Sequence, residues 1–188
     1  ISLKFEGAAH EATVFCNGQE ICTHKCGYTA FEADITPAVV FGGKNRITVR
    51  LDSRENLNIP PFGNVIDYMT FGGIYRPVWL LVRDESHFTS VFVRGDMDGL
   101  MEVSMEAAGP ERCTVKGTLT DMEGNVAAAT EEMAYTGFFS LRVNPVSLWS
   151  VSDPYLYTLR LELIKNGVVS DCRTVRFGFR TVAFNAEG

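Results

Sequence analysis

The sequence predicts an all-β protein with two β-sandwiches in tandem, on three observations. Apolar and polar residues alternate with a period of two, as at Ile47, Val49 and Leu51, which is typical of half-buried strands. Asn-Gly, Gly-Gly and Asp-Gly pairs separate such runs at the roughly 8–12-residue spacing of sandwiches and barrels. The chain of 188 residues, 46% of them hydrophobic, is long enough for two domains of about 100 residues, each with a buried core.

The first predicted domain covers residues 1–87. Asn17-Gly18 predicts a tight hairpin, because both residue types tolerate the positive φ of a type I′ turn. The long segment from Arg54 to Met69 carries no strand pattern, and loops of this length are usually functional. The chain opens at Ile1 within an apparent strand. We therefore expect the opening strands of this sandwich to be missing and its exposed sheet edges to favour a homo-oligomer.

The second predicted domain covers residues 88–182, after a polar run at Asp84 to His87, and residues 183–188 would begin a linker. Its size and strand rhythm predict an immunoglobulin-like sandwich. Asn166-Gly167 predicts a second tight hairpin. Val126 to Ala134 fits either a helix or a strand of poor propensity. Asp96-x-Asp98-Gly99 is interpreted as a hairpin turn, because the later ligands and closing glutamate of a calcium loop are absent.

Composition and charge exclude several classes of partner. The formal net charge is −6 and Lys and Arg do not cluster, so nucleic acid is not expected as a partner. No apolar run approaches the roughly 18 residues of a membrane-spanning helix, so no membrane partner is expected. Five cysteines are an odd number, which favours free thiols in a reducing, cytoplasmic compartment. A bridge between Cys113 and Cys172 stays open as an alternative.

The sequence shows no convincing metal or acid–base site. Alternation places Cys22, His24 and Cys26 on one face of a strand, but zinc sites favour C-x2-C pairs with a second pair elsewhere, and only Cys16 is nearby. We therefore interpret these cysteines as buried or half-exposed thiols. The neighbouring acids Glu131-Glu132 and Asp96/Asp98 fall in strand or turn positions, where a solvated surface is expected.

Four motifs in order carry a resemblance to glycoside hydrolase family 2, the family of β-galactosidases, β-glucuronidases and β-mannosidases. They extend over most of residues 3–182, and the run NIPPFGNVIDYMTFGGIYRPVWL is most similar to a bacterial β-galactosidase. The motifs are VFCNGQEICTHKCGYTAFEADIT at 14–36, DYMTFGGIYRPVWL at 67–80, WSVSDPYLYTL at 149–159 and FGFRTV at 177–182.

The resemblance implies a jelly-roll-type sugar-binding domain followed by an immunoglobulin-like domain. In that family the acid/base and nucleophile glutamates lie on a (β/α)8 barrel that follows, and we expect this chain to stop before it, at Gly188. The chain would then be a non-catalytic fragment of a retaining exo-glycosidase that hydrolyses terminal β-galactosides. No cofactor is expected in this chain, whereas sodium or magnesium is an option for the full-length enzyme.

The resemblance also implies the site residues. The family's aspartate at the position of Asp67 contacts hydroxyls of the terminal sugar; its alternative role here is a loop cap for backbone N–H groups. Asn64 and Tyr68 are weaker substrate-binding candidates, with loop packing as the alternative. Arg76 is interpreted as a structural ion-pair partner. Trp149 and Tyr157 would serve core packing rather than a sugar platform.

Three alternative functions stay open. They are a free-standing carbohydrate-binding module, a structural adhesion sandwich, and a fragment of a β-glucuronidase or β-mannosidase.

Overall fold

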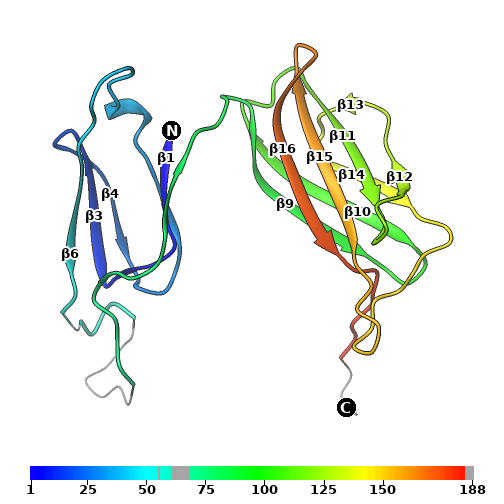
Figure 1. The fold of residues 1–188 in the computed structure, drawn as a ribbon, viewed down its shortest axis with the longest axis horizontal. Helices are drawn as coiled ribbons and strands as arrows, with labels where there is room; N and C mark the ends of the chain where they lie inside the picture. Colours follow the sequence, from blue (N-terminus) through cyan, green and yellow to red (C-terminus); the bar gives the residue numbers. More distant parts are fainter. Residues whose placement is uncertain (55, 61–67, 185–188) are drawn as a thin grey trace. The chain divides into compact units, whose positions relative to one another are not determined.

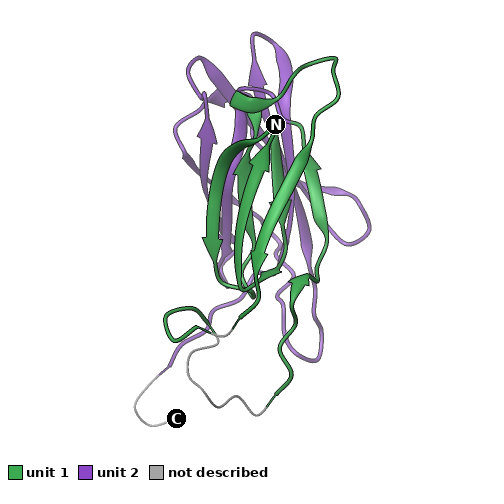
Figure 2. Cartoon of the chain, turned by 90° about the vertical axis from the view of Figure 1, so that its left-hand side faces the viewer, with its two compact units in different colours: residues 1–82 green, residues 83–188 purple. Residues whose placement is uncertain are grey.

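The computed structural model describes residues 1–54, 56–60 and 68–184. The chain divides after Val82 into two compact units, residues 1–82 and 83–188 (Figure 2). The regular elements in the described ranges are β-strands, apart from one short 3-10 helix, η1 (Thr36–Ala38). Each unit has its own sheets and its own core, as the all-β prediction requires. No helix in the described part of the chain is long and apolar enough to cross a membrane.

Unit 1 is a small sandwich of two three-stranded sheets, with orders β5-β1-β8 and β4-β3-β6 (Figure 1), and it also contains a separate two-stranded β2-β7 ladder. Every strand pair is antiparallel. The strands are β1 (Ser2–Phe5), β2 (Ala8–Ala9), β3 (Glu11–Cys16), β4 (Gln19–Lys25), β5 (Phe31–Asp34), β6 (Ile47–Asp52), β7 (Gly73–Ile74) and β8 (Val78–Leu81).

The core of unit 1 draws side chains from both of its larger sheets, which therefore face each other. Leu3 and Phe5 alternate with more exposed neighbours along β1, as a period of two predicts. Phe5 is fully buried and stacks on Phe31 of the neighbouring strand, with ring centroids 4.8 Å apart. Such offset aromatic pairs stabilise a core beyond their buried area. Val14, Cys16, Ala33 and Ile35 complete the cluster.

Unit 2 consists of a three-stranded sheet, β14-β10-β9, and a larger sheet, β12-β11-β15-β16, in which β13 also pairs with β11. Residues 126–134, which fitted a helix or a strand, form β12 and β13. The strands are β9 (His87–Gly95), β10 (Leu100–Ala108), β11 (Cys113–Thr120), β12 (Val126–Ala129), β13 (Met133–Ala134), β14 (Phe138–Arg142), β15 (Tyr157–Lys165) and β16 (Val168–Phe177).

The core of unit 2 lies between its two sheets. Leu159, Leu161 and Leu163 of β15 are fully buried, and the residues between them are more exposed. Met101 and Val103 of β10 enter the same cluster from the other sheet. Each such side chain contributes about 1.5–3 kcal/mol when it leaves water. The strict alternation in the sequence therefore produces a sandwich with one buried face per sheet.

Both predicted Asn-Gly hairpins are confirmed. Asn17 and Gly18 have φ of 51° and 87°, and Asn166 and Gly167 have φ of 52° and 76°. They connect β3 to β4 and β15 to β16 in antiparallel register. Positive φ at both central residues is the signature of the type I′ turn.

The Asp96 segment is also a hairpin turn, between β9 and β10. The Asp96 side chain accepts a hydrogen bond from the backbone N–H of Leu100 at 2.9 Å. Asp98 forms an ion pair with Arg142 at 3.1 Å. Both carboxylates therefore have structural partners.

All five cysteines are free thiols, so the alternative Cys113–Cys172 bridge does not form. Cys113 lies on β11 and Cys172 on β16, and β15 runs between these strands. Strands two places apart in a sheet are separated by about 9–10 Å, beyond the Cα separation of about 7 Å that a disulfide can bridge.

Candidate functional site

The candidate site lies in unit 1, where the chain after the long loop returns to the sandwich at residues 68–76. Tyr75 donates its hydroxyl hydrogen to the carbonyl oxygen of Gly27 at 2.6 Å. The Arg76 guanidinium lies over the Tyr75 ring, 5.2 Å from its centroid. One Arg76 nitrogen also lies 3.4 Å from the carbonyl oxygen of Glu6 and 3.3 Å from that of Tyr28. These contacts fix the returning segment against two other parts of the unit.

A short ladder holds the same segment from the other side. β7 pairs with β2 so that Ala9 lies opposite Gly73. The Ser53 hydroxyl donates to the carbonyl oxygen of Ala9 at 2.8 Å and accepts from the backbone N–H of Gly73 at 3.3 Å. A single hydroxyl thus joins β2, β7 and the residue that follows β6. Polar groups satisfied in this way make the loop end a rigid support.

Gly27 is required by close packing at the base of the site. A Cβ at this position would lie 2.8 Å from the Cβ and 3.2 Å from the Cα of Ala9. Because the backbone approaches Ala9 so closely, the Gly27 carbonyl is within reach of Tyr75. This explains locally why glycine precedes Tyr28.

An aromatic surface covers this support. Phe71 stacks on Tyr75 with ring centroids 5.2 Å apart. Tyr68 and Phe71 are 54% and 62% exposed, and Tyr28 is 37% exposed. Desolvation, followed by the hydrogen bond with Tyr68, raises the pKa of the Tyr28 hydroxyl. The rings offer flat apolar faces with hydroxyl groups at their edges, a combination suited to ligands that are apolar on one side and polar on the other.

The structure describes only one of the three predicted substrate-binding residues. Asp67 and Asn64 lie outside the described residues, so their roles stay predictions. Tyr68 is described and belongs to the aromatic surface. Arg76 has the expected structural role, but its described polar partners are carbonyl oxygens instead of a carboxylate.

Tyr28 contributes to the same surface, although no role is predicted for it from the sequence alone. The signal was present in the motif at 14–36, where Gly27-Tyr28 follows a strand and its polar turn.

The cysteine and histidine group near β4 has other partners. His24 stacks on Phe31 at 4.4 Å, and its Nε2 lies 2.9 Å from the Thr29 hydroxyl. Burial, and then the Glu20 charge, raises the pKa of Cys22. At Cys26 desolvation acts upward, but hydrogen bonds from the Thr29 side chain and from backbone groups of the following turn hold the pKa of its thiol below the usual value. Across the described ranges, no three His, Cys, Asp or Glu side chains converge as metal ligands would.

Two aromatic candidates from the sequence belong to unit 2. Tyr157 is 3% exposed and forms part of the core, which confirms core packing for this residue. Trp149 instead lies at a cavity and carries the Arg180 guanidinium over its indole ring at 4.6 Å. Among the neighbouring acids, the Glu132 carboxylate accepts a hydrogen bond from the Thr114 hydroxyl on the adjacent strand.

Comparison with known proteins agrees with the resemblance over the whole chain. Residues 1–84 match the sugar binding domain of the glycosyl hydrolases family 2, and residues 86–180 match the profile described as glycosyl hydrolases family 2. A β-galactosidase of Thermoanaerobacter pseudethanolicus is 36% identical over 100% of this chain and 27% of its own length. A β-glucuronidase of Paenibacillus borealis is 30% identical over 93% of this chain and 32% of its own.

Solved structures give the same result. The β-glucuronidase of Ruminococcus gnavus in complex with D-glucuronic acid superposes with a TM-score of 0.84 at 27% identity, over 97% of this chain and 33% of the other. The chain thus spans about a third or less of the relatives it matches. With two consecutive domain profiles that together cover nearly all of its residues, the chain belongs to glycosyl hydrolases family 2, of which it carries the sugar-binding and immunoglobulin-like domains.

Proposed function

We propose that this chain is the non-catalytic, sugar-recognising part of a longer retaining exo-glycosidase, and that the enzyme is a β-galactosidase. The observation that carries the proposal is the 36% identity to a β-galactosidase, sustained over the entire chain, together with the match of residues 1–84 to the sugar binding domain. Unit 2 would act as the spacer between sugar recognition and the catalytic barrel that the family resemblance implies.

The candidate site supplies the recognition chemistry in this proposal. The Asp67 carboxylate would accept strong hydrogen bonds from neighbouring sugar hydroxyls, and a site built this way rejects sugars that lack them. Tyr68 and Tyr28 would contribute ring faces and hydroxyls beside it. The contacts of Tyr75, Arg76 and Ser53 hold the segment after Asp67 rigidly, and a preorganised group can express its binding energy in the transition state.

Hydrolysis would depend on residues outside this chain. Retention requires two carboxyl groups about 5–5.5 Å apart, one protonated and one ionised. Three of the neighbouring acids of this chain have structural partners: Asp96 in a turn, Asp98 in an ion pair and Glu132 in a hydrogen bond to a strand residue. Residues 1–188 alone are therefore expected to leave an aryl β-galactoside intact. Turnover by the purified chain that persists in preparations from a host lacking β-galactosidase would contradict the proposal.

Asp67→Ala in the full-length enzyme tests the recognition step. Loss of a charged hydrogen-bond partner should cost about 2 kcal/mol of transition-state stabilisation and lower kcat/KM accordingly. Glu111→Ala, which alters an exposed acid of unit 2, is the control and should leave kcat/KM unchanged. An unchanged value for the Asp67 variant would leave that residue as a loop cap.

The β-glucuronidase relatives support a second candidate activity. Aryl β-galactoside and aryl β-glucuronide assayed side by side on the full-length enzyme distinguish the two, and a preference for the glucuronide would replace the β-galactosidase assignment.

A free-standing binding module is an alternative function that involves no catalysis. Calorimetric titration of residues 1–188 with galactosides should give no binding, whereas a module should bind them in the micromolar to millimolar range.

The proposal extends to assembly and ions of the full-length enzyme. We expect a homo-oligomer in the cytoplasm, which light scattering after size exclusion and cell fractionation would check. A sodium or magnesium requirement is an expectation for the full-length enzyme. Activity in NaCl compared with KCl, and before and after chelation, tests that requirement.

A further inference from the structure

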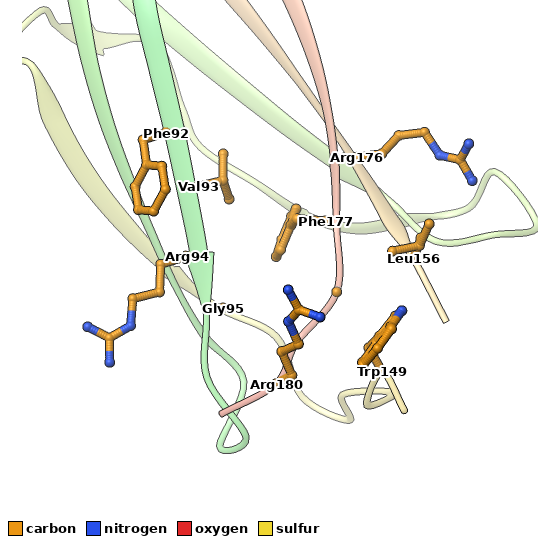
Figure 3. A pocket seen from close by; sticks show the side chains of 10 residues that line it. Phe92, Val93, Arg94, Gly95, Trp149, Leu156, Arg176, Phe177 and Arg180 are labelled. Carbon is orange, nitrogen blue, oxygen red and sulfur yellow. The ribbon is translucent and has the colours of Figure 1, made fainter. Parts of the chain in front are cut away.

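A cavity of about 370 Å³ opens at one end of unit 2 (Figure 3). β9 provides one wall through Phe92 to Gly95, and the end of β16 provides another through Arg176 to Gly178. Trp149 and Arg180 also line the cavity. The volume falls in the range of small-molecule sites, about 300–1,000 Å³.

Arg180 is arranged in this cavity as an anion receptor would be. Its guanidinium lies over the Trp149 indole at 4.6 Å, and Figure 3 shows it between Phe177 and Trp149. The indole covers one face of the guanidinium, whereas the N–H donors lie in the guanidinium plane and are not used by this contact. That fork matches the two oxygens of a carboxylate. Within residues 1–54, 56–60 and 68–184, no carboxylate forms an ion pair with it.

The backbone fixes both members of this pair before any ligand arrives. The backbone N–H of Arg180 donates to the carbonyl oxygen of Gly95 at 3.1 Å, and that of Trp149 donates to Phe179 at 2.9 Å. A Cβ at Gly178 would lie 2.5 Å from the Cβ of Trp149, so glycine permits the close approach of the indole. Because these backbone segments are already ordered, binding would not have to pay for ordering them.

The charge of the lining points to an anion as the ligand. Three arginines line the cavity and no Asp or Glu does. Figure 3 shows the side chains of Arg94 and Arg176 directed away from Arg180. The Arg94 Nη1 lies 4.0 Å from the Oε2 of Glu102. Arg180 therefore provides the direct contact. Arg176 adds a screened positive field, and Glu102 partly balances the charge of Arg94.

We propose that this cavity binds a carboxylate, with Arg180 as the bidentate partner and Trp149 and Phe177 as apolar walls. The carboxylate can come from a small organic acid or from an Asp or Glu side chain of the longer polypeptide. The proposal rests on unit 2 alone and stands independently of the sugar-recognition role proposed for unit 1.

Titration of residues 1–188 with 4-fluorobenzoate tests the proposal, with Trp149 emission as the readout. Trp79→Phe removes the second tryptophan, which lies in unit 1, so that emission reports this cavity alone. We expect a saturable response with a dissociation constant in the millimolar range. The neutral isostere 4-fluorobenzamide should bind at least about tenfold more weakly, because it lacks the charge that Arg180 recognises. Equal responses to the two compounds would overturn the proposal.

Variants of the arginines locate the contact. Arg180→Gln should weaken 4-fluorobenzoate binding about tenfold, and Arg180→Lys should fall between it and the parent because lysine keeps the charge but loses the fork. Arg176→Gln is the matched control and should change affinity by no more than about twofold, since exposed charges act through screened fields. An Arg180→Gln or Arg180→Lys protein that folds normally by circular dichroism and binds like the parent would refute the assignment.

The same variants in the full-length polypeptide distinguish the sources of the carboxylate. If a side chain of the polypeptide fills the cavity, ¹⁹F spectra should show no Arg180-dependent binding of 4-fluorobenzoate, and Arg180→Gln should lower the thermal midpoint. If the cavity serves a free acid, Arg180-dependent binding should persist. Absence of both effects, or of any saturable response in residues 1–188, would overturn the carboxylate site.

Discussion

Tyr75 and Gly27 are joined by a hydrogen bond of 2.6 Å between a hydroxyl and a backbone carbonyl, although 48 residues separate them in the chain. This contact ties the segment that follows the long loop to the turn that carries Tyr28. The aromatic surface therefore depends on a long-range contact that neither segment makes by itself.

Tyr75→Phe should destabilise unit 1 by about 1 kcal/mol, because the Gly27 carbonyl loses its partner while the ring and its packing stay. Urea unfolding followed by Trp79 emission, in a Trp149→Phe background, measures the stability of that unit. The control is Tyr68→Phe, a half-exposed hydroxyl whose loss should cost less than about 0.5 kcal/mol. Equal effects of the two substitutions would show that the Tyr75 hydroxyl does not anchor the segment.

Gly178→Ala should destabilise unit 2 by about 1–3 kcal/mol, because the new Cβ would lie 2.5 Å from the Cβ and 2.8 Å from the Cγ of Trp149. Trp149 must move, so its emission should shift in a Trp79→Phe background. Gly124→Ala separates crowding from backbone strain. Gly124 has a φ of 87° and no neighbour within 4 Å of an added Cβ, so its substitution should cost stability and leave the emission of Trp149 unchanged. Unaltered emission in Gly178→Ala would contradict the packing described here.

Replacing the asparagine by glycine should destabilise one Asn-Gly hairpin and leave the other unchanged. Asn17 and Asn166 share positive φ, but only Asn17 uses its side chain widely, donating to Ala38 and Asn45 at 2.8 Å and accepting from the Arg46 N–H at 2.9 Å. Asn17→Gly should therefore cost about 1–3 kcal/mol. Asn166→Gly should be neutral within about 0.5 kcal/mol, since glycine relieves the positive φ at little cost. Denaturant midpoints of the two variants check this, and similar losses at both sites would refute it.

These hairpins show what the sequence could predict. Alternation and turn residues are local signals, so the strand at Ile47 to Leu51 and the turns at Asn17 and Asn166 can be predicted without a structure. The two-residue strands β2, β7 and β13 cannot be predicted in this way, because they are too short to show an alternation and exist only through pairing with another strand. Residues 126–134 were ambiguous because alanine-rich segments have weak strand propensity, and pairing with β11 decides their conformation.

The contacts of the candidate site in unit 1 and of the cavity in unit 2 divide in the same way. Motif resemblance singled out Tyr68 and Arg76, but the Tyr28–Tyr68 contact and the stacking of Arg180 on Trp149 are tertiary. Residues 28 and 68 are brought together by the β2-β7 ladder and the Tyr75 anchor, and residues 149 and 180 by hydrogen bonds between separate segments. No spacing within one motif encodes such pairs.

Cys26 should react with iodoacetamide at lower pH than Cys22. Hydrogen bonds from Thr29 and from backbone groups of the following turn outweigh desolvation and lower the pKa of Cys26, whereas burial and the Glu20 charge raise that of Cys22. The thiolate is the nucleophile, so the alkylation rate of Cys26 should reach half of its plateau at a pH below the usual thiol pKa, and that of Cys22 at a pH above it. Mass spectrometry of each labelled peptide across about pH 6.5–10.5, roughly two units either side of the usual thiol pKa of about 8.5, measures both midpoints.

Thr29→Val identifies the cause of this difference. Without the Thr29 hydroxyl, the Cys26 midpoint should move up toward that of Cys22, because the thiolate loses a hydrogen-bond donor while desolvation stays. Thr23→Val removes a hydroxyl that pairs with Thr13 at 3.0 Å and should leave the Cys26 midpoint in place. If the two threonine variants behave alike, the Thr29 hydroxyl is not what lowers the pKa of Cys26, and its reactivity would have to come from the backbone hydrogen bonds of the turn or from exposure.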